Sequence, residues 1–159
     1  MSNRRPSITP RQSGPCVALV GDVYRILVSG KETAGKYALI ETIVTPGGGP
    51  PPHRHSREEE GFYILEGELT VTVDGQRETL TPGMFANLPV GSVHSFKNEG
   101  AETVRMLLTV APAGFEEMLL ELGQPIPPDS TTAPPPSKEE IEKLVQTSGR
   151  FGIELMPTT

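Results

Sequence analysis

The sequence has few of the features that mark disulfide-bonded, membrane-spanning or nucleic-acid-binding proteins. Its one cysteine, Cys16, excludes an internal disulfide, and the residue fits a small buried position better than a nucleophile. No segment reaches the roughly 18 apolar residues that a membrane-spanning helix requires. The formal net charge of −6 argues against nucleic acid or an anionic membrane as a partner.

The N-terminal residues contain several arginines but lack the apolar run that a secretory signal needs. Because the lone cysteine also suits a reducing compartment, the sequence predicts a cytoplasmic protein. We expect residues 1–15 to form a flexible N-terminal arm, which a partner subunit can order.

Glycine and proline are abundant, at 17 residues each of 159, and they favour many short strands over long helices. The length suits one compact domain, with strand-like segments over residues 16–112. Strand 69–73 runs into Asp74-Gly75, a pair that tolerates the positive φ angles of a type I′ hairpin turn. Other expected strands are 23–28, 37–44, 62–65 and 103–110, with a turn at 30–35. This pattern predicts an all-β antiparallel barrel or sandwich.

Residues 113–159 form a C-terminal extension of different composition, helical and proline-rich. Residues 115–122 have helical spacing, and residues 125–136 are expected to run extended. Ser137 and Glu140 form a capping box that starts a second helix. Its expected apolar face is Ile141, Leu144 and Val145. We expect both helices to pack on the outside of the barrel; the alternative is that one of them closes its mouth.

The chain contains only three histidines, and their spacing indicates a metal site. His53 and His55 are two residues apart, so on a strand they point to the same face. Glu60 follows beyond a short turn, and His94 must come from a distant strand. Three neutral imidazoles and one carboxylate can hold a divalent first-row metal and leave coordination positions for water, substrate or dioxygen.

Two gapped motifs contain these residues. The first is Gly47-x5-His53-x-His55-x4-Glu60-x6-Gly67, and the second is Gly83-x5-Pro89-x-Gly91-x2-His94-x3-Asn98. Both motifs resemble, in full, the two motifs of the cupin superfamily, and the likeness extends over about residues 17–112. The resemblance implies a double-stranded β-helix, also called a jelly roll, with a metal held by His53, His55, Glu60 and His94. It also implies a homodimer that exchanges the arm or an outer strand.

Glu58, Glu59 and Glu60 are adjacent, so more than one of them could be the acidic ligand of the metal. A three-residue spacing from His55 would choose Glu59, whereas the six-residue gap to Gly67 chooses Glu60. Glu58 and Glu59 are then expected to lie on a solvated rim of the site. Asn98 is expected to serve a turn or packing instead of binding the metal.

Strand alternation predicts the lining of a substrate pocket beside the metal. The expected residues are Phe62, Ile64, Phe96, Met106 and Leu108. Simple core packing is an equally good interpretation of each. An apolar lining suits an aromatic or otherwise hydrophobic molecule better than a sugar phosphate, and Gly47-Gly48-Gly49 lacks the following helix of a phosphate-binding loop.

The layout is similar to that of cupins described as quercetin dioxygenase-like. This resemblance implies a metal-dependent oxidoreductase of dioxygenase type, in which Glu60 accepts a proton from the substrate. The ligand set admits Fe, Mn, Ni, Cu, Co or Zn. The alternatives are a non-catalytic small-molecule binding or sensing protein, and a metal-dependent isomerase or lyase. The last would need a cation near the metal, for which Arg25, Lys36 and Arg105 are the candidates.

Overall fold

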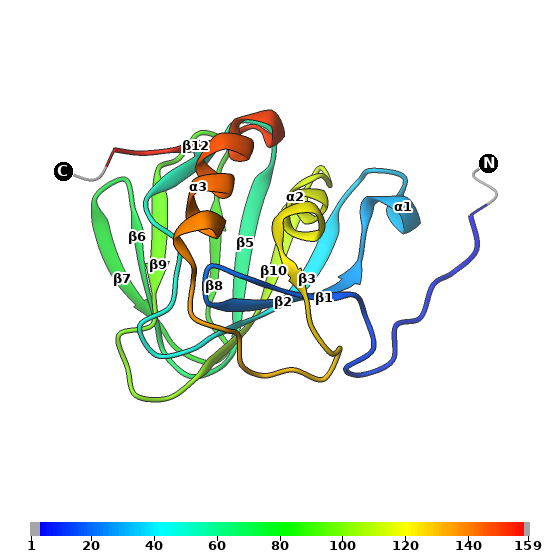
Figure 1. Ribbon diagram of the computed structural model, residues 1–159, viewed down its shortest axis with the longest axis horizontal. Coiled ribbons are helices and arrows are strands. Elements are labelled where there is room, and N and C mark those ends of the chain that lie inside the picture. Colours follow the sequence, from blue (N-terminus) through cyan, green and yellow to red (C-terminus); the bar gives the residue numbers. More distant parts are fainter. Residues whose placement is uncertain (1–3, 158–159) are drawn as a thin grey trace.

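The computed structural model describes residues 4–157, and its main feature is a pair of antiparallel sheets facing each other (Figure 1). The larger sheet has the order β11-β1-β2-β3-β10-β5-β8, and the smaller has the order β12-β4-β9-β6-β7. This arrangement confirms the predicted all-β jelly roll with a short helical extension.

The bounds of the elements are as follows. The larger sheet consists of β1 (Cys16–Leu19), β2 (Asp22–Val28), β3 (Ala38–Val44), β5 (Glu59–Glu66), β8 (Phe85–Leu88), β10 (Val104–Ala111) and β11 (Gln124–Pro125). The smaller sheet consists of β4 (His53–His55), β6 (Leu69–Val73), β7 (Gln76–Leu80), β9 (His94–Lys97) and β12 (Ile153–Leu155). The helices are α1 (Gly30–Thr33), α2 (Phe115–Leu122), α3 (Lys138–Thr147) and the 3₁₀ helix η1 (Ser148–Phe151).

The core lies between the sheets because side chains alternate along each strand. On β10, Met106 and Leu108 are buried while their neighbours are half-exposed. In register with them across β5 lie Ile64 and Phe62, both fully buried. Inward-facing apolar side chains of both sheets join in one cluster, which also takes in α2.

The structure contains the predicted hairpin turn between β6 and β7, but it differs from the predicted turn at residues 30–35. Asp74 and Gly75 have φ angles of 47° and 82°, as a type I′ turn requires. In the second segment the expected turn contains the short helix α1, because Ser29 and Glu32 form a capping box. That helix ends at Ala34 in the left-handed conformation.

The C-terminal extension wraps the barrel and then joins its smaller sheet. The guanidinium of the buried Arg25 donates to the carbonyls of Pro128 and Ser130, and so holds the proline-rich segment in place. The helix α3 begins at the predicted capping box, and β12 then pairs with β4 (Figure 1). On α3 only Leu144 packs against the core.

The expected apolar face of α3 is therefore only partly used. Ile141 and Val145 are 44% and 60% exposed, because a single row of the helix faces the barrel. Among residues 4–157, no helix combines the length and apolar character needed to cross a membrane. Of the expected arm, residues 1–3 lie outside the described part of the chain, and residues 4–10 form neither helix nor strand.

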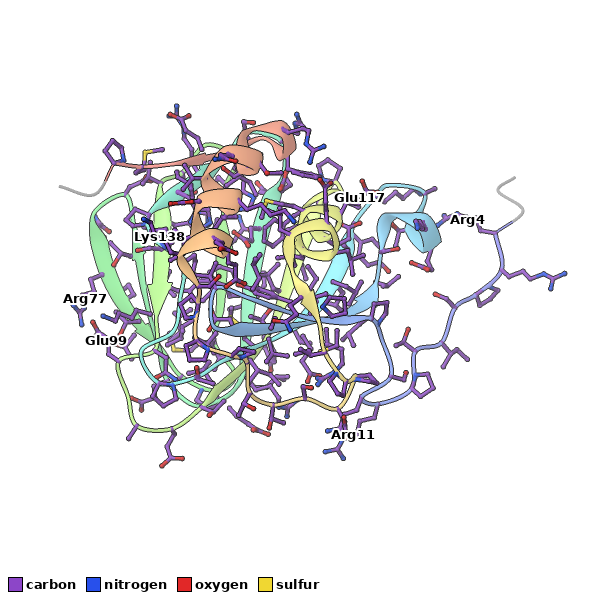
Figure 2. The ribbon with its side chains drawn as sticks, viewed as in Figure 1. Arg4, Arg11, Arg77, Glu99, Glu117 and Lys138 are labelled. Carbon is purple, nitrogen blue, oxygen red and sulfur yellow. The ribbon has the colours of Figure 1, made fainter. Side chains whose placement is uncertain are left out.

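Several ion pairs lie at the outer surface, away from the core. Arg77 on β7 and Glu99 after β9 point towards each other at the edge of the smaller sheet (Figure 2). Lys138, at the start of α3, lies near Glu142 one turn later. Exposed pairs of this kind contribute about 0–1 kcal/mol each, so packing between the sheets is the larger contribution to stability.

Candidate metal centre

The four expected ligands meet between the two sheets. His53 and His55 lie on β4, His94 on β9, and Glu60 on β5 of the opposite sheet. One potential ligand atom of each lies within 4.8 Å of the others, and all four side chains are buried. His53 and His94 face each other directly in the β4–β9 ladder. Residues 41 positions apart are thus brought together by strand pairing.

Each imidazole is oriented through its Nδ1 atom. The Nδ1 of His53 lies 2.8 Å from the Pro51 carbonyl, and that of His94 lies 3.2 Å from the Ser92 carbonyl. The Nδ1 of His55 lies 2.8 Å from a carboxylate oxygen of Glu58. Because these partners only accept hydrogen bonds, each Nδ1 carries a proton, and a metal would bind at the Nε2 atoms in place of the proton that His94 Nε2 shares with Glu60. This is the tautomer that binds a metal through Nε2.

The Nε2 atoms of His55 and His94 lie near the Glu60 carboxylate, but only one of them forms a hydrogen bond with it. The Nε2 of His94 lies 2.8 Å from Glu60 Oε2. The Nε2 of His55 lies 3.3 Å from the same oxygen, yet it is not aligned for a hydrogen bond and has no partner. A buried nitrogen without a partner is unfavourable in a protein interior. The donor types and this orphaned atom fit a divalent metal ion.

Burial and the neighbouring charges set the protonation of the ligands. Burial lowers the pKa of His53 to about 4, so this ring is neutral near pH 7. Burial favours a raised pKa for Glu60, but the hydrogen bond from His94 and the neighbouring histidines bring it below its usual value. For His55, burial is the largest single cause and lowers the pKa, but the hydrogen bond to Glu58 and the charges of Glu60 and Glu58 together outweigh it, so the pKa is raised. A metal therefore competes with a proton at His55, and binding tightens as pH rises.

Glu58 has a different place from the one expected. It was expected on a solvated rim, but it is only 3% exposed and contacts His55. Glu59 is exposed, as expected for a rim residue. Glu58 precedes the first residue of β5, so the loop from β4 turns its side chain back over the i−3 histidine. The His55-x2-Glu58 spacing is the signal in the sequence that points to this contact.

The loop before β4 packs against the strand that carries His94. The N–H of Gly47 donates to the Asn98 carbonyl, and the N–H of Asn98 donates to the Gly48 carbonyl. The Asn98 amide donates to the carbonyls of Val44 and Glu102, in agreement with its expected packing role. These bonds hold the beginning of the first motif against the end of the second.

A cavity of about 60 Å³ lies beside the ligands, bordered by His53 and Glu60. Of the expected lining residues, Phe96 and Leu108 face it. Phe62, Ile64 and Met106 are fully buried in the core and do not line the cavity. The ring of Phe62 packs edge-on against Phe96, with 5.3 Å between ring centroids, so Phe62 supports the wall from behind.

Much of the cavity wall comes from segments that the sequence reasoning did not assign to it. The helix α2 contributes Phe115, Met118 and Leu119. Leu144 of α3 and two residues of β12, Ile153 and Leu155, complete the apolar wall. Both helices, which were expected to pack on the outside of the barrel, thus also contribute side chains to the cavity wall. Hydrophobic positions show that a helix packs, but not against which surface.

Two polar side chains on β2, Asp22 and Tyr24, also line the cavity and were not expected. Of the described residues that line it, none is arginine or lysine. The candidate cations lie elsewhere: Arg25 pairs with Glu41, Arg105 pairs with Glu66, and Lys36 lies at a surface hollow beside residues 4–7.

A cluster of three histidines and one glutamate between the sheets of a jelly roll defines a metal-binding β-barrel protein. The chain matches the Cupin domain family over residues 40–110. It is 34% identical over 108 residues to quercetin 2,3-dioxygenase of Bacillus subtilis. The aligned region covers 67% of this chain and 32% of that protein. The chain belongs to the cupin superfamily.

Solved structures show the same fold. KdgF from a Halomonas species aligns with a TM-score of 0.63 at 16% identity, over 71% of this chain and 99% of that one. The polyketide cyclase RemF from Streptomyces resistomycificus aligns with a TM-score of 0.60 at 25% identity, over 67% of this chain and 80% of that one. The ligand positions in the two motifs therefore lie within a fold that other solved proteins share.

Proposed function

We propose that the protein is a metal-dependent oxidoreductase of dioxygenase type, acting on a small, largely apolar or aromatic molecule bound at the metal. The observation that carries the proposal is the mostly apolar cavity that borders His53 and Glu60. The similarity to quercetin 2,3-dioxygenase supports this chemistry. Because the chain spans about a third of that enzyme's length, the substrate is to be found by experiment.

The residues of the site have separate proposed roles in metal binding, proton transfer and enclosure of the substrate. His53, His55, Glu60 and His94 would hold the metal, and Glu58 keeps His55 in the required tautomer. A bound divalent metal supplies Lewis acidity, which lowers the pKa of a coordinated hydroxyl, together with redox activity if it is iron, manganese, nickel or copper. Glu60 is the carboxylate of the ligand set, and its lowered pKa keeps it ionised and able to accept the substrate proton. The apolar wall excludes water from the reacting groups.

Substrate entry requires movement of part of this wall. A cavity of about 60 Å³ is smaller than the 300–1,000 Å³ typical of ligand pockets. On the helix α3, which contributes Leu144 to the wall, every residue is at least partly exposed. We infer that α3 shifts when a substrate binds, while β12 stays paired with β4 and the ligand strands β4, β5 and β9 remain in place.

The absence of arginine and lysine from the cavity lining weighs against an isomerase or lyase acting on an anionic metabolite. A binding or sensing protein would hold the same metal and ligand but would not convert the ligand into a product.

The first experiment is elemental analysis of protein purified without a histidine tag or chelator, compared with His94→Ala. We expect near one equivalent of a redox-active metal, reduced in the variant.

Oxygen consumption with a flavonol and with catechols then tests catalysis. Uptake of dioxygen that depends on both the metal and the compound supports the proposal. Tight binding without oxygen uptake contradicts it and assigns a binding role, and zinc as the sole metal contradicts the redox chemistry. A cytoplasmic homodimer is part of the same proposal, and the molar mass in solution checks the dimer.

A further inference from the structure

Buried polar atoms without partners point to a second binding position in the barrel. Within the described residues there are three such side-chain atoms: His55 Nε2, Asp22 Oδ1 and Thr42 Oγ1. A metal accounts for the first. The other two lie on adjacent strands, β2 and β3, in the larger sheet. Of these two residues, only Asp22 lines the cavity.

Asp22 is a carboxyl group enclosed by mostly apolar side chains. It is the first residue of β2, is 1% exposed, and borders the same cavity as His53 and Glu60. It forms no ion pair within residues 4–157, and the N–H of Gly49 is the backbone group that favours its ionised form. Burial dominates and raises the pKa of Asp22 to about 7. An unpaired buried carboxyl destabilises the fold, which suggests that it is retained for a ligand.

Tyr24 is a second polar residue of β2 that lies beside Asp22 in the cavity wall. Two residues further along β2, it points to the same face and lines the same cavity. Its hydroxyl has no hydrogen-bond partner among the described residues. Burial and the nearby charges of Asp22 and Glu60 raise its pKa, so the phenol keeps its proton and can donate it in a hydrogen bond. Because both charges act on it, Tyr24 lies within electrostatic reach of both carboxylates.

We propose that Asp22 and Tyr24 form a second anchoring point for the substrate, separate from the metal ligands. Asp22 accepts a hydrogen bond from a hydroxyl or amine of the substrate, and Tyr24 donates to an oxygen beside it. The substrate is then a small molecule with a metal-binding oxygen at one position and a hydrogen-bond donor at another, joined by an apolar body. This inference rests on the proposed binding of the substrate at the metal.

The test compares chelators that differ in one remote hydroxyl. Kojic acid and allomaltol share a metal-binding hydroxypyranone and differ in a hydroxymethyl against a methyl group. Hydroxytyrosol and 4-ethylcatechol form a second pair with a longer reach. Binding is measured on cobalt(II)-loaded protein through its visible spectrum, for the native chain and for Asp22→Leu, Asp22→Asn and Thr42→Val. Thr42→Val is the matched control, because it removes a buried unpartnered oxygen of a residue that does not line the cavity.

In at least one pair, we expect the native protein to bind the hydroxyl compound about tenfold more tightly than its partner, as a hydrogen bond to a charged group allows. Asp22→Leu should abolish the preference, Asp22→Asn should reduce it, and Thr42→Val should keep it. The cobalt content should be the same in all four proteins. Equal affinities within both pairs, or a preference that survives Asp22→Leu, would overturn the proposal.

Two further outcomes separate this inference from the proposed function. If no chelator changes the cobalt spectrum, binding of substrates at the metal is contradicted, and the inference fails with it. If all chelators bind and the hydroxyl makes no difference, only the role of Asp22 and Tyr24 is overturned. A loss of cobalt in both Asp22 variants would assign Asp22 to positioning the Gly48–Gly49 loop and would also overturn its role as an anchor.

Discussion

At the scale of single residues, neighbouring carboxylates in the first motif have different tasks. Glu60 faces the metal position from β5, Glu58 orients His55, and Glu59 is exposed to solvent. The difference comes from backbone direction, because Glu58 lies before the strand and the other two lie on it. The hydrogen bond between Glu58 and His55 is therefore part of the metal centre.

Replacing Glu58 by glutamine should weaken metal binding while the ligands remain. The amide can still accept a hydrogen bond, but it removes the charge that makes His55 a stronger ligand, so we expect affinity to fall about tenfold. Competition with a chromophoric chelator measures the change. Glu59→Gln is the control, since that side chain is exposed. Equal affinities in Glu58→Gln and the native protein would remove Glu58 from the metal centre.

Asp22 should make stability depend on pH in a recognisable direction. Its pKa rises from 3.8 in the unfolded chain to about 7 in the folded protein. The folded state thus holds an additional proton between these values, and its stability decreases as pH rises through this window. In metal-free protein, we expect the stability advantage of Asp22→Asn over the native chain to grow by roughly 3 kcal/mol between pH 5 and pH 8. Urea unfolding measures it, and parallel curves would contradict it.

At the scale of elements, the loop between β3 and β4 positions the first two histidines. Gly47 and Gly49 both have positive φ angles, 83° and 129°. A methyl group at Gly49 would lie 2.0 Å from the Phe96 carbonyl oxygen, whereas one at Gly47 meets nothing within 4 Å. The close approach of this loop to β9 is therefore possible only with glycine at position 49.

Alanine substitutions at these two glycines should have unequal effects. Gly47→Ala should cost about 1 kcal/mol of stability, through backbone strain alone. Gly49→Ala should cost at least about twice as much, because the loop must also move away from β9. It should lower the metal content too, since His53 follows this loop. Thermal unfolding and elemental analysis check both results, and similar effects of the two substitutions would refute the role of the close approach.

The C-terminal segment has two tasks at this scale. Its strand β12 pairs with β4, placing Ile153 opposite His55 and Leu155 opposite His53. Leu144 of α3 and these two β12 residues also form part of the cavity wall. The segment that shields the cavity is thus hydrogen-bonded, through β12, to the strand carrying two ligands, so β12 fixes one wall of the cavity relative to the metal centre.

At the scale of the whole molecule, a metal would link the two sheets. Three ligands come from the smaller sheet and Glu60 comes from the larger one. A metal at 100 times its Kd stabilises the folded state by about 2.7 kcal/mol if the unfolded chain does not bind it. We expect chelator treatment to lower Tm by roughly 5–10 °C. His94→Ala should lack most of this difference, and an equal chelator effect in both proteins would contradict the assignment.

The long strands β2, β3, β5 and β10, the hairpin strand β6, the helices α2 and α3, and all four candidate ligands could be predicted from residue patterns in the sequence. The hairpin at Asp74-Gly75 and the capping box at Ser137 and Glu140 each depend on residues within four positions of one another. The ligands follow from gapped motifs whose spacing reflects strand alternation. The metal's identity and the substrate leave no such local pattern, because both depend on the geometry of assembled side chains.

The sequence by itself determined the strand pattern, the turns, the capping of α3 and the four candidate ligands, since each is encoded by neighbouring residues or by a motif of fixed spacing. Only the tertiary structure decided that Glu58 turns inward to His55, that β12 pairs with β4, and that Asp22 and Tyr24 face the cavity. The last two are contacts between segments far apart along the chain; Ile153, for example, pairs with His55. Their formation depends on which apolar faces pack together, and single-residue patterns do not specify the partner of a face.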